Sequence, residues 1–174
     1  ERLLSRIIMA IAGRQYPPRS MKIRRLLDLI TSNNNVRGYT LGGCRLLMKK
    51  NLIYVLREES GVCPSIQLTA GVRLLWDNRF SVLLKKDQST ATKVGPLTAL
   101  GWNKLIKLNK NLKKISIPYE ARIVLPAIWG DDDLLAVPHI EYYNPDIIGL
   151  SSELEIKWMP RLAVGPARFG LGKF

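Results

Sequence analysis

The stretch Tyr39–Ser60, YTLGGCRLLMKKNLIYVLREES, decides how this chain folds. Two apolar runs, Leu46–Met48 and Leu52–Leu56, lie on either side of the polar break Lys49-Lys50-Asn51. Short apolar runs separated by a polar break predict a β-hairpin, and the turn type stays open because the break has no Asn-Gly or Asp-Gly pair. The glycine pair Gly42-Gly43 permits a backbone shape or a close approach that a side chain would block. We expect this hairpin to separate a helical segment from a sheet-based domain.

Two amphipathic helices are predicted before the hairpin, over residues 1–12 and 21–31, because apolar residues recur there at i, i+3, i+4 and i+7. Gly13 is the expected end of the first helix, and Ser20 is the expected N-cap of the second. Two helices of this length cannot bury both apolar stripes alone. They need either the following sheet or a helical partner outside this sequence.

After the hairpin, the pattern changes to short strands with polar turns and one longer helix. The expected strands are 71–76, 79–84, 128–129, 134–137 and 153–158, and the expected helices are 100–112 and 116–126. We therefore predict an α+β fold, with a mostly antiparallel sheet domain and one or two packed helices. The predicted domains are residues 1–35, a partial helical domain, and residues 36–174, a C-terminal α+β domain.

The charge of the chain is large and unevenly placed. The net charge is +13. Residues 1–114 hold 22 basic and 6 acidic side chains, whereas residues 115–157 hold 2 basic and 8 acidic ones. Such a distribution indicates an electropositive surface for a polyanion and a separate surface that avoids it. RNA is the expected partner, and a generally basic protein with no polyanion partner is the alternative.

The candidate contacts to RNA phosphates are paired or clustered basic residues, since lysine and arginine bind phosphates with release of counterions. Each cluster has the alternative of being solvated surface with no partner. The candidates are Arg24, Arg25, Lys49, Lys50, Lys85, Lys86, Lys104, Lys107 and Lys114.

Catalytic and metal-binding patterns are weak throughout the sequence. Cys44 and Cys63 form no Cys-x-x-Cys pair and there is one histidine, which is too few ligands for zinc. We expect both cysteines to be free thiols in a reducing cytoplasm. Asp131-Asp132-Asp133 is expected to be a turn rather than a magnesium site, and His139 has no paired nucleophile. The sequence therefore predicts no catalytic residue and no metal site.

Two further expectations come from apolar residues. No apolar run approaches the roughly 18 residues that a membrane-spanning helix needs, so no membrane contact is predicted. The four tryptophans lie within or beside apolar runs, so core packing is favoured over stacking on bases. They are Trp76, Trp102, Trp129 and Trp158.

Several blocks together carry a resemblance to a known family. They are TLGGCRL (40–46) with REE (57–59), WDNRF (76–80), LPAIWGDDDLLAVPHI (125–140), and the YPPR segment (16–19) between the two helices. With these blocks the chain resembles the C-terminal part of bacterial tRNA(Ile)-lysidine synthetases, in their alphaproteobacterial form. The likeness extends over nearly the whole chain, and the LPAIW…LLAVP block is its most specific part.

The resemblance implies a cytoplasmic, ATP-dependent ligase that joins lysine to the wobble cytidine of the isoleucine tRNA with a CAU anticodon. In that family ATP, magnesium and lysine belong to an N-terminal pyrophosphatase-loop domain with a Ser-Gly-Gly-x-Asp-Ser motif. Gly42-Gly43 is followed by Cys44-Arg45-Leu46, so that motif is absent here.

This chain is then expected to be the tRNA-holding portion, with no cofactor of its own and no catalytic motif. The alternative is a non-enzymatic basic RNA- or protein-binding module. A start at Glu1 rather than Met suggests a piece of a longer protein. Whether the molecule forms a homodimer is left open.

Overall fold

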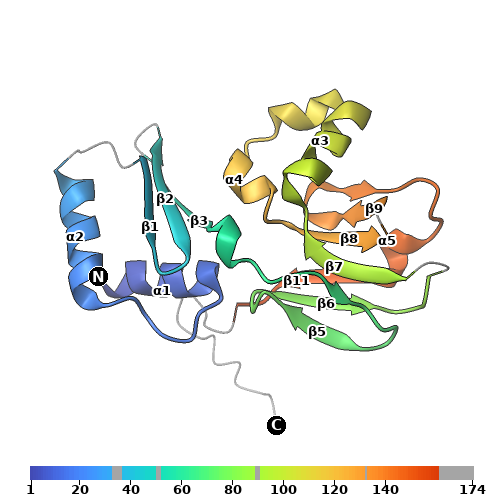
Figure 1. Cartoon of the computed structure of the whole chain (residues 1–174), viewed down its shortest axis with the longest axis horizontal. Helices are drawn as coiled ribbons and strands as arrows, with labels where there is room; N and C mark the ends of the chain where they lie inside the picture. The colour runs from blue at the N-terminus through green and yellow to red at the C-terminus, as the bar shows by residue number, and fades with distance from the viewer. Residues whose placement is uncertain (33–36, 50–51, 89–90, 132, 161–174) are drawn as a thin grey trace, which may run out of the picture.

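The computed structural model of the chain has two lobes (Figure 1) and describes residues 1–32, 37–49, 52–88, 91–131 and 133–160. The first lobe, on the left of Figure 1, packs two helices against a small sheet. Its elements are α1 (Arg2–Ala12), α2 (Ser20–Thr31), β1 (Arg37–Leu41), β2 (Cys44–Lys49) and β3 (Leu52–Arg57).

The predicted hairpin is confirmed as β2 and β3, which pair antiparallel with Leu46 opposite Val55. The turn at residues 50–51 lies outside the described residues. β1 adds a third strand next to β2. One buried cluster joins Ile8 and Leu26 of the helices to Leu46 of the sheet. The apolar stripes of the two helices are thus covered by the following sheet. The helices before residue 35 and the strands after it therefore share one apolar core. The division into domains stays a prediction.

The glycine pair forms the two-residue turn between β1 and β2. The sequence patterns did not predict β1. Gly42 and Gly43 have φ values of 64° and 84°, which side-chain-bearing residues rarely adopt. A Cβ atom on Gly42 would lie 2.8 Å from Pro18 Cγ and 2.9 Å from Ile8 Cγ2. The turn therefore packs directly on α1 and on the proline pair that links α1 to α2.

The second lobe contains two antiparallel sheets and most of the remaining helices. One sheet has the strand order β10-β9-β8-β7-β4, and the other has the order β11-β6-β5. The strands are β4 (Ile66–Gln67), β5 (Arg73–Trp76), β6 (Phe80–Leu84), β7 (Thr92–Pro96), β8 (Pro126–Gly130), β9 (Asp133–Val137), β10 (Tyr142–Tyr143) and β11 (Leu154–Trp158). The helices are α3 (Thr98–Leu108), α4 (Tyr119–Arg122) and α5 (Leu150–Glu153), with 3-10 turns η1 (Glu59–Gly61), η2 (Lys110–Lys114) and η3 (Pro138–Ile140).

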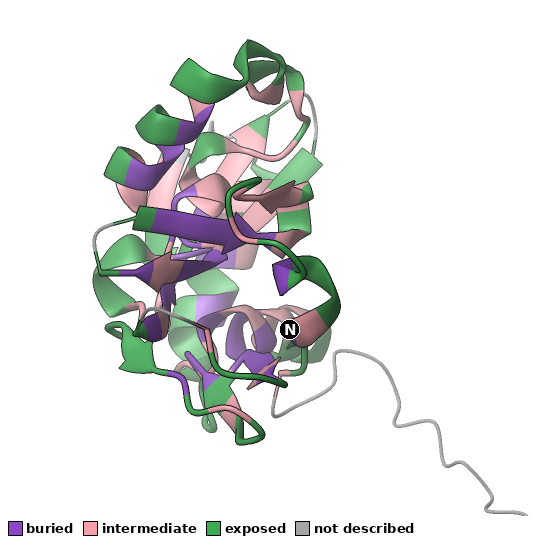
Figure 2. Cartoon of the chain, turned by 90° about the vertical axis from the view of Figure 1, so that its right-hand side faces the viewer, coloured by how far each residue is buried: buried purple, intermediate pink, exposed green. Residues whose placement is uncertain are grey.

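The second lobe is built in three layers. Ile128 of the five-stranded sheet packs with Val82 of the three-stranded sheet, whereas Ala127 packs with Trp102 and Leu105 of α3. Because both faces of β8 and β9 are covered, their sequences read as continuous apolar runs rather than as alternating ones. Buried residues accordingly concentrate in the central strands of Figure 2. This arrangement confirms the predicted α+β fold.

Some local predictions were wrong at element boundaries. Ser20 lies inside α2, whose N-cap is Arg19 without a side-chain cap bond. The segment before α3 forms β7, a strand that the sequence patterns did not predict. Pro126 is the first residue of β8, although the predicted helix 116–126 was expected to end there. A proline is tolerated at the start of a strand, where its missing N–H is not needed for pairing. The long predicted helix ends at Leu108, and Asn109 caps the 3-10 turn η2 that follows.

A buried carboxylate joins the two lobes. Asp77, in the β5–β6 turn, accepts two hydrogen bonds from Arg57 at the end of β3, at 3.1 Å from Nε and 3.0 Å from Nη2. Arg79 Nε donates to the same carboxylate at 2.7 Å, and the backbone N–H of Cys63 donates at 3.0 Å. The three charged side chains are only 1–7% exposed. Arg57 also donates to the carbonyl oxygens of Gly43 and Gly61, which ties the first lobe to the chain that leaves it.

The surroundings of this junction shift the pKa values of its groups. Burial by itself raises the pKa of Asp77, but the hydrogen bonds from Arg57 and the charges of Arg79 and Arg57 outweigh it, so the pKa lies below its usual value. Burial raises the pKa of the nearby Cys44 thiol to about 12. Both cysteines are free thiols, as predicted.

We expect Gly42→Ala to lower the free energy of unfolding by about 2–4 kcal/mol, because the new methyl group overpacks Pro18 and Ile8 and strains the backbone. Gly71→Ala is the matched control, since Gly71 also has a positive φ (75°) but a Cβ atom there meets nothing within 4 Å. It should cost only about 1–2 kcal/mol. Urea denaturation of both variants checks this, and equal losses would contradict the packing argument.

We expect Asp77→Asn to lower the free energy of unfolding by about 3–5 kcal/mol, because two buried guanidinium groups lose their counter-charge. The folded-state pKa of Asp77 lies below its unfolded value of about 3.9. Its stabilisation is therefore complete above that value and is lost as the pH falls through the folded pKa.

Urea denaturation between neutral and acidic pH provides the measurement. Wild type should lose more stability in acid than Asp77→Asn does. The exposed Asp87 offers a control, because Asp87→Asn removes the same charge without touching the junction. An Asp77→Asn variant as stable as Asp87→Asn would show that the junction does not hold the lobes together.

Candidate nucleic-acid interface

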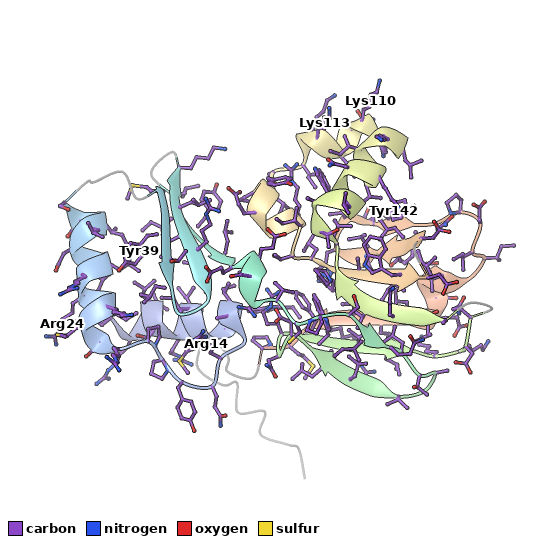
Figure 3. The ribbon with its side chains drawn as sticks, in the orientation of Figure 1. Arg14, Arg24, Tyr39, Lys110, Lys113 and Tyr142 are labelled. Atoms are coloured by element: carbon purple, nitrogen blue, oxygen red, sulfur yellow. The ribbon has the colours of Figure 1, made fainter. Side chains whose placement is uncertain are left out.

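Five exposed lysines lie together on the α3–η2 segment, which we call the lysine ridge: Lys104, Lys107, Lys110, Lys113 and Lys114. Residues 88–119, which include the ridge, contain no Asp or Glu. Among the described residues, no ion pair involves the last four of these lysines. In Figure 3, Lys110 and Lys113 extend away from the body of the second lobe. The ridge is thus a projecting, strongly basic surface, on which Lys107, Lys110, Lys113 and Lys114 have no ion-pair partner among the described residues.

The inner side of the same segment holds the ridge in place. Trp102 and Leu105 of α3 are buried against the five-stranded sheet, while Lys104 and Lys107 of the same helix are exposed. The guanidinium carbon of Arg122 lies 4.7 Å from the centroid of the Trp102 ring. Arg122 also donates to the carbonyl oxygens of Ile117 and Ile115, at 2.7 and 2.9 Å. Arg122 therefore fixes the chain that returns from η2 to α4.

The predicted basic residues of the first lobe differ in their surroundings. Arg24 of α2 pairs with Glu1 at 2.8 Å, and both side chains are exposed. Arg25 on α2 and Lys49 at the end of β2 are exposed. Lys50 lies outside the described residues. In Figure 3, Arg24 lies on the far side of the first lobe, opposite the end of the molecule where Lys110 and Lys113 project.

The predicted pair Lys85 and Lys86 lies beside acidic residues. Lys85 Nζ is 3.6 Å from Glu155 and donates to the carbonyl oxygen of Ser152 at 3.0 Å, while Lys86 is 3.3 Å from Glu153. β11 pairs antiparallel with β6 and so brings these acids to the end of β6. The separation of charge along the sequence is therefore lost on this sheet.

Arg73 adds to this mixed-charge patch by donating to Glu155 at 3.0 Å. This hydrogen bond lowers the pKa of Glu155. The lysines of this patch face carboxylates that compete with any phosphate for the same positive charge. The positive charge of this patch is therefore more strongly compensated than that of the ridge.

Several expected residues have roles other than direct contact. Trp76 and Trp102 are 0% and 2% exposed, as expected for core residues, whereas Trp129 is half-buried and Trp158 is 47% exposed. The prediction that all four tryptophans pack in the core was therefore wrong for Trp158 and only partly correct for Trp129. His139 packs its ring edge-on against Phe80 at a centroid distance of 5.2 Å.

The other motif residues serve the fold. Gly130 pairs with Asp133 where β8 is followed by β9, which agrees with the expected turn, and Asp132 lies outside the described residues. The residues that sequence reasoning left out of the basic cluster are Lys110 and Lys113. The acid-free run from residue 88 to 119 was the signal that could have found them. None of the described helices is long and apolar enough to cross a membrane.

The chain is similar in sequence to several tRNA(Ile)-lysidine synthases. It is 33% identical over 154 residues to that of Ruegeria pomeroyi, which covers 88% of this chain and 33% of the relative. It is 30% identical over 142 residues to that of Wolbachia pipientis wMel, covering 81% and 32%. It is 29% identical over 149 residues to that of the Wolbachia of Brugia malayi, covering 85% and 33%. These similarities confirm the resemblance inferred from the motifs.

The chain spans about a third of the length of the relatives it matches. No family model matches it, and no solved structure matches it significantly.

Proposed function

Because the chain belongs by sequence to the tRNA(Ile)-lysidine synthase family, we propose that it is a tRNA-binding portion of such an enzyme. In this proposal the whole protein uses ATP and magnesium to attach lysine to the wobble cytidine of isoleucine tRNA. The reacting groups belong to a part of the enzyme that this sequence does not contain. The chain supplies binding energy, and it holds the tRNA in a position from which the anticodon reaches that distant site.

The lysine ridge is the observation that supports this proposal most directly. Folded RNA presents regularly spaced phosphates, and proteins recognise duplex RNA mainly through phosphates, 2′-hydroxyl groups and shape. Such recognition needs several accessible cations rather than one enclosed pocket. Lys107, Lys110, Lys113 and Lys114 meet this need because they are exposed and have no ion-pair partner in the described parts of the chain.

The remaining predicted contacts rank below the ridge. Arg25 and Lys49 are exposed on the first lobe and could meet a second part of the same tRNA. Arg24, Lys85 and Lys86 each lie within 4 Å of a carboxylate, so a phosphate must displace or outcompete that carboxylate. We therefore assign the ridge the largest share of the electrostatic binding.

The double variant Lys107→Gln/Lys110→Gln tests the assignment. It should weaken binding of isoleucine tRNA on the order of tenfold at physiological salt, and it should reduce the slope of log K against log salt by about two, because two phosphate contacts are lost. Filter-binding titrations at several salt concentrations provide both numbers.

Lys85→Gln/Lys86→Gln is the matched control, because it removes the same charge where the lysines already face Glu155 and Glu153. Its effect should be smaller. Equal losses in the two double variants would mean that net charge, rather than the ridge, governs binding. Equal affinity of the wild-type chain for an unrelated tRNA would favour a general RNA-binding module.

A further inference from the structure

A pocket of about 320 Å³ lies beside the lysine ridge, between α3 and strands β7 and β8 of the five-stranded sheet. We call it the Trp129 pocket. Its volume is at the lower end of the range for small-ligand sites. Its walls combine an aromatic ring, aliphatic side chains and two lysines: Lys93, Pro96, Thr98, Leu100, Lys104 and Trp129.

The indole ring in this pocket is held rigidly. Trp129 Nε1 donates to the carbonyl oxygen of Pro96 at 3.2 Å. The far edge of the ring rests against Gly101 of α3, where a Cβ atom would lie 2.9 Å from Trp129 Cη2. Only glycine allows the helix to approach the ring so closely. Since Trp129 is only half-buried, part of its ring stays accessible at the pocket.

The polar groups of the pocket suit one nucleotide. Lys93 Nζ donates to the backbone carbonyl of Asp131 at 2.9 Å, so its positive charge is fixed near the ring. Lys104 belongs to both the pocket and the lysine ridge. Asp131 places a carboxylate at the pocket, and a carboxylate accepts hydrogen bonds from base amino groups but repels phosphates. A base at the ring and its phosphate at a lysine satisfy all of these groups.

The start of α3 at this pocket is strained. Thr98 has a φ of 63°, and β-branched residues are genuine outliers in that region. The strain is maintained by two hydrogen bonds, from Thr98 N to the carbonyl of Ile123 at 2.8 Å and from Gly101 N to Thr98 Oγ1 at 3.3 Å. Backbone strain of this kind clusters at binding sites.

From these observations we propose that the Trp129 pocket binds a single unstacked nucleotide of the RNA, with the base on the Trp129 ring and Leu100 as its outer wall. This inference rests on the proposed RNA binding and adds to it a site for a nucleotide outside a helix. The ridge then contacts duplex phosphates, and the pocket recognises the place where a strand leaves the duplex. Base–aromatic stacking changes affinity by roughly 5- to 150-fold per base.

Two exposed leucines of α3 allow a matched test. Leu100 lines the pocket and is 76% exposed, while Leu108 lies at the other end of the helix and is 72% exposed. We expect Leu100→Ser to weaken binding of a short unstructured single-stranded RNA about fivefold or more, without changing the affinity for a blunt RNA duplex. Leu108→Ser should leave single-strand affinity at the wild-type value.

A second measurement needs no mutation. Single-stranded RNA that carries 4-thiouridine should, on irradiation, crosslink to the peptide that contains Trp129. Crosslinks confined to the exposed Trp158, or no effect of Leu100→Ser, would overturn the pocket while duplex and tRNA binding persist. Absence of binding to any of these RNAs would instead overturn the proposed function itself.

Discussion

The buried carboxylate of Asp77, held between the guanidinium groups of Arg57 and Arg79, is the constraint on which the rest of the structure depends. Charges this deeply buried are tolerated only when they are paired and hydrogen-bonded. Arg57 ends the sheet of the first lobe, and Asp77 lies in a turn of the second. Two lobes with separate apolar cores are therefore joined by a polar contact that fails if either partner is lost.

This junction explains what the family blocks do. The Arg of REE and the Asp and Arg of WDNRF form the junction itself, and Arg57 donates to Gly43 within the TLGGCRL block. The LPAIW and LLAVP runs are β8 and β9, which are apolar because both of their faces are covered. The residues that carry the resemblance thus determine the architecture. The lysine ridge lies outside these blocks, on α3 and η2, where positive charge rather than packing is required, whereas Trp129 of the proposed pocket belongs to the LPAIW run.

Two parts of the second lobe present their positive charge differently. On α3 and η2, Trp102 and Leu105 are buried while Lys107, Lys110, Lys113 and Lys114 are exposed without an ion-pair partner among the described residues. On the three-stranded sheet of the same lobe, β11 supplies Glu155 beside Arg73 and Lys85. A chain with a net charge of +13 can therefore still have a defined binding surface, because folding neutralises some of its cations and not others.

Periodicity and turn chemistry in the sequence determined the two N-terminal helices, the β2–β3 and β5–β6 hairpins, α3 and the acid-free lysine run, since these depend on neighbours within a few residues. Tertiary structure alone decided that Arg57 meets Asp77, that Glu153 and Glu155 reach Lys86 and Lys85, and that α3 closes on Trp129 through Gly101. An apolar stripe indicates that a face is buried, but it does not indicate which distant element covers it. Contacts between distant elements form only when that choice is made, and the junction, the mixed-charge patch and the Trp129 pocket all consist of such contacts.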